Sequence, residues 1–140
     1  MRRTFVMLAT VLVAAAALSG CDNGPSTAPT PPATNPITET FTGTVNLNGS
    51  VTHSFSATAA GTVTATITSL DPATGSVLGF QMGTWNTVTC SAVLSNDVAT
   101  TGSAFTASTQ SAASLCVKLH DPNGALTANP VSYTVTVVHN

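Results

Sequence analysis

Apolar side chains and threonines alternate along residues 37–68, and this alternation restricts the fold more than any other feature of the chain. One parity holds large apolar residues, among them Phe41, Phe55 and Ile67, whereas the other parity is mostly threonine and serine. Successive side chains of a β-strand point to opposite faces of a sheet, and β-branched threonine suits an exposed strand face. The pattern therefore predicts three strands, each with one buried face.

The connection between the first two strands contains Asn48-Gly49, a pair that is typical of a two-residue hairpin loop. A two-residue loop would place Leu47 opposite Ser50 and so mix apolar and polar side chains on one face. We therefore favour a three-residue loop, Asn48-Gly49-Ser50, and the alternative is a corner that sends the second strand to the other sheet.

Further short strands are expected along the rest of the chain, at residues 78–82, 88–94, 103–109, 115–119 and 131–137. Ser95-Asn96-Asp97 is expected to end the second of these. Asp121-Pro122-Asn123-Gly124 is expected to form a turn, because proline fixes φ and glycine accepts a positive φ. Seven or eight short strands without helical periodicity are typical of an all-β fold, an antiparallel β-sandwich. We assign residues 37–140 to one such domain.

Residues 1–20 have the composition of an export signal. Met1-Arg2-Arg3 precedes an apolar run from Phe5 to Leu18, which is shorter than the roughly 20 residues that a membrane-spanning helix needs. Leu18-Ser19-Gly20-Cys21 then resembles the lipobox of bacterial lipoproteins. The resemblance implies cleavage between Gly20 and Cys21 and acylation of Cys21, including palmitate. It also implies an exported protein anchored to a lipid bilayer of the cell envelope, in the periplasm or facing the surface.

Residues 21–36 connect this signal to the domain. They hold five of the eight prolines and no large apolar residue, so they cannot form a core. Proline-rich chain favours extended polyproline II structure at about 3.1 Å per residue. We expect a disordered tether that reaches roughly 45 Å from the membrane.

The chain carries little charge, since only 6% of its residues are Asp, Glu, Lys or Arg. Once residues 1–20 are removed, Lys118 is the only Lys or Arg and stands against five acidic residues. Phosphate binding depends on clustered Lys and Arg, so the composition argues against a nucleic-acid partner. Solubility is expected to depend on the many threonine and serine hydroxyls instead.

Cys90 and Cys116 remain once Cys21 is assigned to lipid. An even pair of cysteines in an exported domain predicts a disulfide bond. The spacing is not CxxC, and no basic neighbour favours a reactive thiolate, so we do not expect a redox or metal-binding pair.

No motif predicts catalysis, a cofactor or a metal site. The sequence has no G-x-S-x-G elbow for a nucleophilic serine, and His53, His120 and His139 lack the spacing of zinc ligands. Glu39 is the sole glutamate, and the aspartates form no clustered calcium loop. We therefore predict that the protein is not an enzyme.

Trp85 is the only tryptophan and the main candidate for a ligand contact. We expect its ring to pack over a Cys90–Cys116 bridge in the core. The alternative is an exposed ring that binds carbohydrate together with Asn86 and Gln81. Two functions therefore stand: a structural or protein-interaction module that contacts another envelope protein, or a weak glycan-binding module.

A set of strand and turn motifs extends over residues 37–140. It consists of Phe41-x-Gly43, Gly49-Ser50-Val51-x-His53-x-Phe55, Ala60-Gly61-Thr62-Val63, Asp121-Pro122-Asn123-Gly124 and Tyr133-Thr134-Val135-Thr136-Val137. Together these motifs resemble bacterial pre-peptidase C-terminal (PPC-type) domains. That family consists of small β-sandwiches, usually appended to secreted proteases and other exported enzymes, where they look like accessory or adhesive modules. The resemblance implies a sandwich with an accessory role, although this chain departs from the family's setting because no enzyme accompanies the domain.

Overall fold

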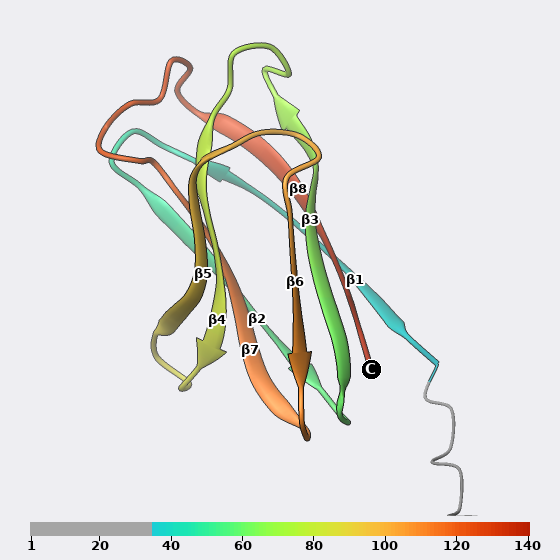
Figure 1. Ribbon diagram of the computed structural model, residues 1–140. Coiled ribbons are helices and arrows are strands. Elements are labelled where there is room, and N and C mark those ends of the chain that lie inside the picture. Colours follow the sequence, from blue (N-terminus) through green and yellow to red (C-terminus); the bar gives the residue numbers. More distant parts are fainter. Residues whose placement is uncertain (1–34) are drawn as a thin grey trace, which may run out of the picture. The chain divides into compact units, whose positions relative to one another are not determined.

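The computed structural model describes residues 35–140, which form eight β-strands and no helix (Figure 1). The predicted signal, the lipobox-like stretch with Gly20 and Cys21, and the predicted tether up to Thr34 lie outside the described residues. Within the described part, no helix is long and apolar enough to span a membrane. The strands are β1 (Ile37–Val45), β2 (Ser50–Ala57), β3 (Gly61–Asp71), β4 (Leu78–Trp85), β5 (Cys90–Ala99), β6 (Ala104–Thr109), β7 (Ala113–His120) and β8 (Val131–His139).

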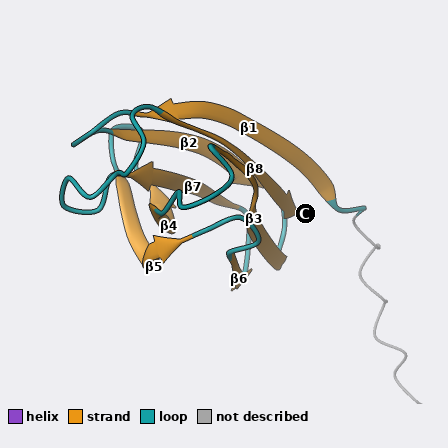
Figure 2. Ribbon diagram, turned by 90° about the horizontal axis from the view of Figure 1, so that it is seen from above, coloured by secondary structure: helices purple, strands orange, loops and turns teal. Residues whose placement is uncertain are grey.

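The strands form two four-stranded antiparallel sheets, which confirms the predicted β-sandwich. One sheet has the strand order β1-β8-β3-β6 and the other has the order β2-β7-β4-β5. Figure 2 shows β1 and β2 together at one side of the two layers, and β5 and β6 at the other side. We call these sides the β1/β2 flank and the β5/β6 flank, because each is bounded by one edge strand from each sheet.

The predicted alternation decides which side chains reach the space between the sheets. Phe55 and Ile67 are buried, whereas the serines and threonines of the opposite parity in β2 and β3 are exposed or partly exposed. The core combines these residues with Phe80 and Leu119 of β4 and β7, and with Val135 of β8. Burial of a large apolar side chain stabilises a fold by about 1.5–3 kcal/mol, so this shared core is the main source of stability.

The connection from β1 to β2 is a corner between the two sheets, so the favoured three-residue hairpin loop is wrong and the alternative is correct. Asn48 has a φ of 56°, and the Gly49 N–H donates a hydrogen bond of 2.8 Å to the Asn46 carbonyl. The buried Asp121 carboxylate accepts hydrogen bonds from the N–H groups of Asn48 at 2.7 Å and Ala125 at 2.8 Å. Asp121 therefore holds the corner against the loop that follows β7.

Strand β5 differs from the prediction in its bounds. A strand was expected at residues 88–94 and its end at Ser95-Asn96-Asp97, but β5 runs from Cys90 to Ala99. Its register with β4 shifts twice, once at Val93 and once near its C-terminal end. A β-bulge adds a residue to one strand without ending it, so the turn-forming residues are accommodated inside β5.

Cys90 and Cys116 form a disulfide bond with an S–S distance of 2.06 Å, which confirms the predicted pair. The bond joins β5 to β7 across β4, beside Gly83, which is the register partner of Cys116. A Cβ atom at Gly83 would collide with the backbone carbonyl of Ser91, so only glycine fits where β5 passes over β4. Disulfides are typical of proteins in oxidising compartments outside the cytoplasm.

Replacing both cysteines, as Cys90→Ala with Cys116→Ala, should lower the free energy of unfolding. The bond closes a loop of 26 residues, and a loop of that length constrains the unfolded chain by about 3.5 kcal/mol in the chain-entropy model. Urea unfolding of the two proteins measures the difference. A reducing agent should destabilise the parent protein and leave the variant unchanged, and equal stability of parent and variant would contradict the prediction.

Candidate functional site

Aromatic rings from both sheets join at the β1/β2 flank around His53. The rings of Phe41 and His53 stack with centroids 4.9 Å apart, and His53 Nε2 lies 2.7 Å from the Tyr133 hydroxyl oxygen. A Cβ atom at Gly43 would collide with the Tyr133 ring, so glycine makes this approach possible. Burial lowers the pKa of His53 and raises the pKa of Tyr133 to about 12. Both groups are therefore neutral near pH 7 and connect the sheets as a hydrogen-bonded pair.

The other two histidines also have partners within the fold. His139 is buried, its Nε2 lies 2.8 Å from the Glu39 carboxylate, and its ring centroid is 5.4 Å from that of Phe55. His120 lies on the other sheet, where its Nε2 is 3.4 Å from the Asp97 carboxylate. Each histidine thus has a different partner, and residues 35–140 contain no group of three or more His, Cys, Asp or Glu residues that could hold a metal.

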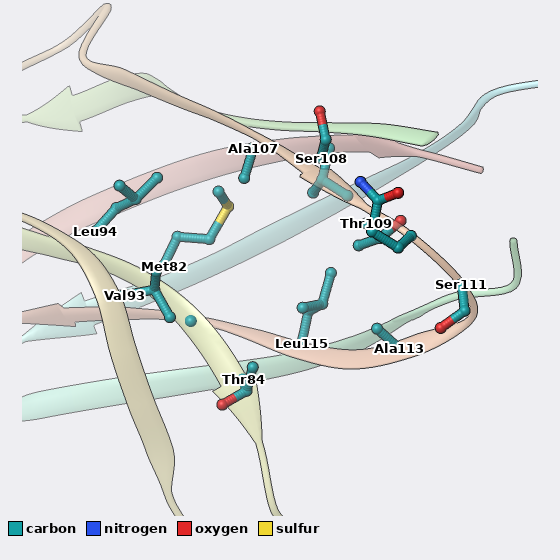
Figure 3. Close-up of a pocket in the computed structure, with 13 residues that line it drawn as sticks. Met82, Thr84, Val93, Leu94, Ala107, Ser108, Thr109, Ser111, Ala113 and Leu115 are labelled. Carbon is teal, nitrogen blue, oxygen red and sulfur yellow. The ribbon is translucent and has the colours of Figure 1, made fainter. Parts of the chain in front are cut away.

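The β5/β6 flank differs, because a hollow of about 240 Å³ opens there between the sheets (Figure 3). In Figure 3 the side chains of Met82 and Leu115 extend from one sheet toward the strand that carries Ala107. The apolar part of the lining is completed by Val63, Val93, Leu94 and Ala113. The remaining lining side chains carry hydroxyl or amide groups and none is charged. The hollow is therefore suited to an apolar, uncharged group.

The hollow exists because a small residue follows a large one on the inward face of β6. Phe105 stacks on Phe80 of the facing sheet with a centroid distance of 4.9 Å. Ala107 is two residues further along the same face and opposite Met82 across the gap, where its methyl group leaves space. Interiors of folded proteins are normally close-packed, so an unfilled apolar space of this size is a candidate binding site.

Large apolar side chains are also exposed at this flank. Val93 and Val98 of β5 are 72% and 74% exposed, and Val88 in the turn before β5 is 78% exposed. No other large apolar residue in residues 35–140 is more than half exposed. Single exposed valines are common on protein surfaces, but these three belong to one edge strand and the turn that leads into it, and Val93 also lines the hollow.

The candidate ligand residues predicted from the sequence lie elsewhere, on and after β4. Trp85 is opposite Cys90 in the strand register, next to the disulfide, but it is partly exposed and outside the buried core, so the expected core placement is wrong. Asn86 Oδ1 accepts hydrogen bonds from the Val88 and Thr89 N–H groups at 3.1 and 2.7 Å. Gln81 Nε2 donates to a serine hydroxyl of β5 at 3.4 Å. Asn86 therefore shapes the β4–β5 turn.

Sequence reasoning did not find the hollow. Its lining comes from β3, β4, β5, β6, β7 and the β6–β7 turn, so no single segment carries its pattern. The one local signal is the change from Phe105 to Ala107 on one face of β6, which has meaning only once Met82 and Leu94 are known to lie opposite.

These features define a small, disulfide-bonded β-sandwich of two four-stranded sheets, joined by ring contacts at one flank and hollow at the other. Neither the models of known protein families nor the curated proteins provide a significant match to this chain.

Burial of neutral His53 predicts that acid weakens the fold. Because burial holds the pKa of His53 below its ordinary value of 6.5, the unfolded chain binds a proton first as the pH falls. The free energy of unfolding should therefore decrease as the pH falls below about 6.5, until the folded protein binds the proton too. Urea unfolding at several pH values measures this.

His53→Gln is the matched control, since glutamine can keep a hydrogen bond to Tyr133 but does not titrate. Between about pH 7.5 and pH 5 the variant should lose less stability than the parent, because residue 53 no longer binds a proton. Some loss should remain, because both proteins keep the other histidines and the carboxylates. An identical pH dependence of the two proteins would show that His53 does not contribute.

Proposed function

We propose that this protein is a non-catalytic interaction module of the bacterial cell envelope, tethered to a membrane through an acylated Cys21, and that it binds its partner at the β5/β6 flank. The observation that carries the proposal is the difference between the two flanks. Rings and histidines join the sheets at the β1/β2 flank, whereas the β5/β6 flank has an apolar hollow and exposed valines. An exposed apolar patch beside a pocket is typical of binding surfaces.

The membrane address is supported by two independent features. The lipobox-like Leu18-Ser19-Gly20-Cys21 follows an apolar run of the length of an export signal, and the Cys90–Cys116 bond suits an oxidising compartment. Two or more acyl chains hold a protein on a bilayer much more firmly than one does. The likeness to PPC-type domains favours an accessory role for the sandwich.

A non-catalytic role is supported by the way the fold uses its reactive side chains. His53 contacts Tyr133 and His139 contacts Phe55 across the two sheets, and Asp121 is bonded to backbone N–H groups. The hollow is lined by no charged or titratable side chain that could act as a general acid or base.

Cys21→Ser should release the protein from the membrane. Serine has no sulfur atom that could be alkylated, so the variant should lose labelled palmitate and move from the membrane pellet to the soluble fraction after cell lysis. Ser19→Thr, which keeps Cys21, serves as the control. Membrane association of the Cys21→Ser protein that withstands high salt would contradict lipid anchoring at Cys21.

A photoreactive amino acid placed at Val93 or Thr106, on the two strands of the β5/β6 flank, should crosslink to one defined envelope protein in cells. The same amino acid at Thr42 of β1 or Ser54 of β2 is the control, because both side chains are exposed at the opposite flank. Equal crosslinking at all four positions, or at the control positions alone, would contradict binding at the β5/β6 flank.

Glycan binding through Trp85 is the second candidate, and it is favoured by the partly exposed position of that ring. It predicts retention of the protein on an envelope-glycan column and loss of retention in Trp85→Ala. Absence of any protein crosslink together with such retention would select the glycan function instead.

A further inference from the structure

The two strands that bound the β5/β6 flank differ in their ability to pair with a further strand. β5 has two register irregularities, and bulges of this kind keep an edge strand from pairing. β6 pairs with β3 without any shift from Gly61–Thr109 to Thr66–Ala104, and its other side is unpaired. It carries no proline and no charge. β6 is thus the regular, open edge beside the hollow.

The register of β6 identifies its free backbone groups. Beyond the end of the strand, the Ile67 N–H donates to the Ser103 carbonyl at 2.9 Å. In an antiparallel pair, residues alternate between those bonded to the neighbouring strand and those that point away from it. By that alternation Phe105 and Ala107 bond to β3, and the N–H and C=O groups of Thr106 and Ser108 point to the open edge.

A strand added at this edge would also reach the hollow. In a sheet, side chains at alternate positions lie on the same face as those of the neighbouring strand. The inward face of β6 carries Phe105 and Ala107, so alternate side chains of an added strand would enter the gap between the sheets. There they would meet Met82, Val93 and Leu94, which line the hollow from the facing sheet.

We propose that β6 receives an additional β-strand from a partner polypeptide: an extended, uncharged segment whose alternate side chains are large and apolar, one of which fills the hollow. Backbone hydrogen bonds supply the pairing, and the pocket selects the side chain, as in other cases of strand addition. Because the lining is uncharged and a buried charge without a partner is costly, the segment must be uncharged as well. This inference rests on the proposed function and specifies the chemistry of the partner.

Neither residues 22–36 nor the β6 strand of a second copy is suited to be such a segment. Residues 22–36 hold five prolines, which lack the N–H that a strand donates, and no large apolar side chain. The β6 strand of a second copy has its inward side chains, Phe105 and Ala107, packed against its own core. Pairing of β6 with β6 would therefore leave both hollows unfilled.

The test uses the full chain with Cys21→Ser, exported and purified, and a neutral synthetic seven-residue peptide that alternates threonine with valine and leucine. Amide hydrogen exchange is measured by NMR. At a peptide concentration about ten times the dissociation constant, exchange at Thr106 and Ser108 should slow by about tenfold. The amides of Phe105 and Ala107, which already bond to β3, should be protected both with and without the peptide. A scrambled peptide with clustered apolar residues is the peptide control.

Two substitutions separate the pairing from the pocket. Thr106→Pro removes an N–H that points to the open edge, where proline is tolerated, and should abolish peptide binding, whereas Thr106→Val keeps the N–H and should bind normally. Ala107→Leu should fill the hollow and weaken binding at least tenfold. The dispersion of the NMR spectra checks that Thr106→Pro and Ala107→Leu are folded. Normal binding by Thr106→Pro would overturn strand addition.

Two further results would overturn the inference. One is equal binding of the scrambled peptide. The other is protection of Thr106 and Ser108 without peptide, in a sample that sedimentation shows to be a dimer, because a second copy would then occupy the edge. If strand addition fails in these ways while crosslinks at Val93 and Thr106 persist in cells, the proposed function stands and only the mode of binding is wrong.

Discussion

The structure depends on burying one face of every strand in a single gap between two sheets, although the chain changes sheet at almost every connection. Within residues 35–140, β4 and β5 are the only consecutive strands that pair with each other. All other pairings join distant segments, such as β1 with β8 and β2 with β7. Because local pairing contributes so little, the alternation of apolar and hydroxyl side chains must be consistent in every strand, and folds dominated by distant pairings form slowly.

That constraint explains why the first half of the fold could be predicted and why its pairing could not. Parity identifies the buried face, so the strands around Phe41, Phe55 and Ile67 and the turn at Asn123-Gly124 follow from the sequence, with φ values of 62° and 70° in that turn. Parity does not name the partner strand. A hairpin and a corner after Val45 bury the same side chains, and the corner is bonded to Asp121, which is distant in sequence.

The predictions for β5 and Trp85 also differ from the structure because pairing between strands decides what the local sequence does not. Asn96 and Asp97 favour turns locally, but the pairing of β5 with β4 continues past them through a bulge. Trp85 was expected in the core, yet it pairs with Cys90 beside the disulfide and its ring remains partly exposed. The hollow could not be predicted because its size depends on the facing of Ala107 and Met82 across two sheets.

The contacts between the sheets at the β1/β2 flank allow the hollow at the β5/β6 flank to persist. An apolar hollow without a ligand loses packing contacts, and a flexible sandwich would collapse into it. The contacts of His53 with Tyr133 and of His139 with Phe55 join the two sheets at the β1/β2 flank. The Cys90–Cys116 bond fixes the start of β5, so Val93 and Leu94 stay at the opening. Because the space is preformed, binding of a partner does not include the entropic cost of ordering the site. This favours tight binding by even a short segment.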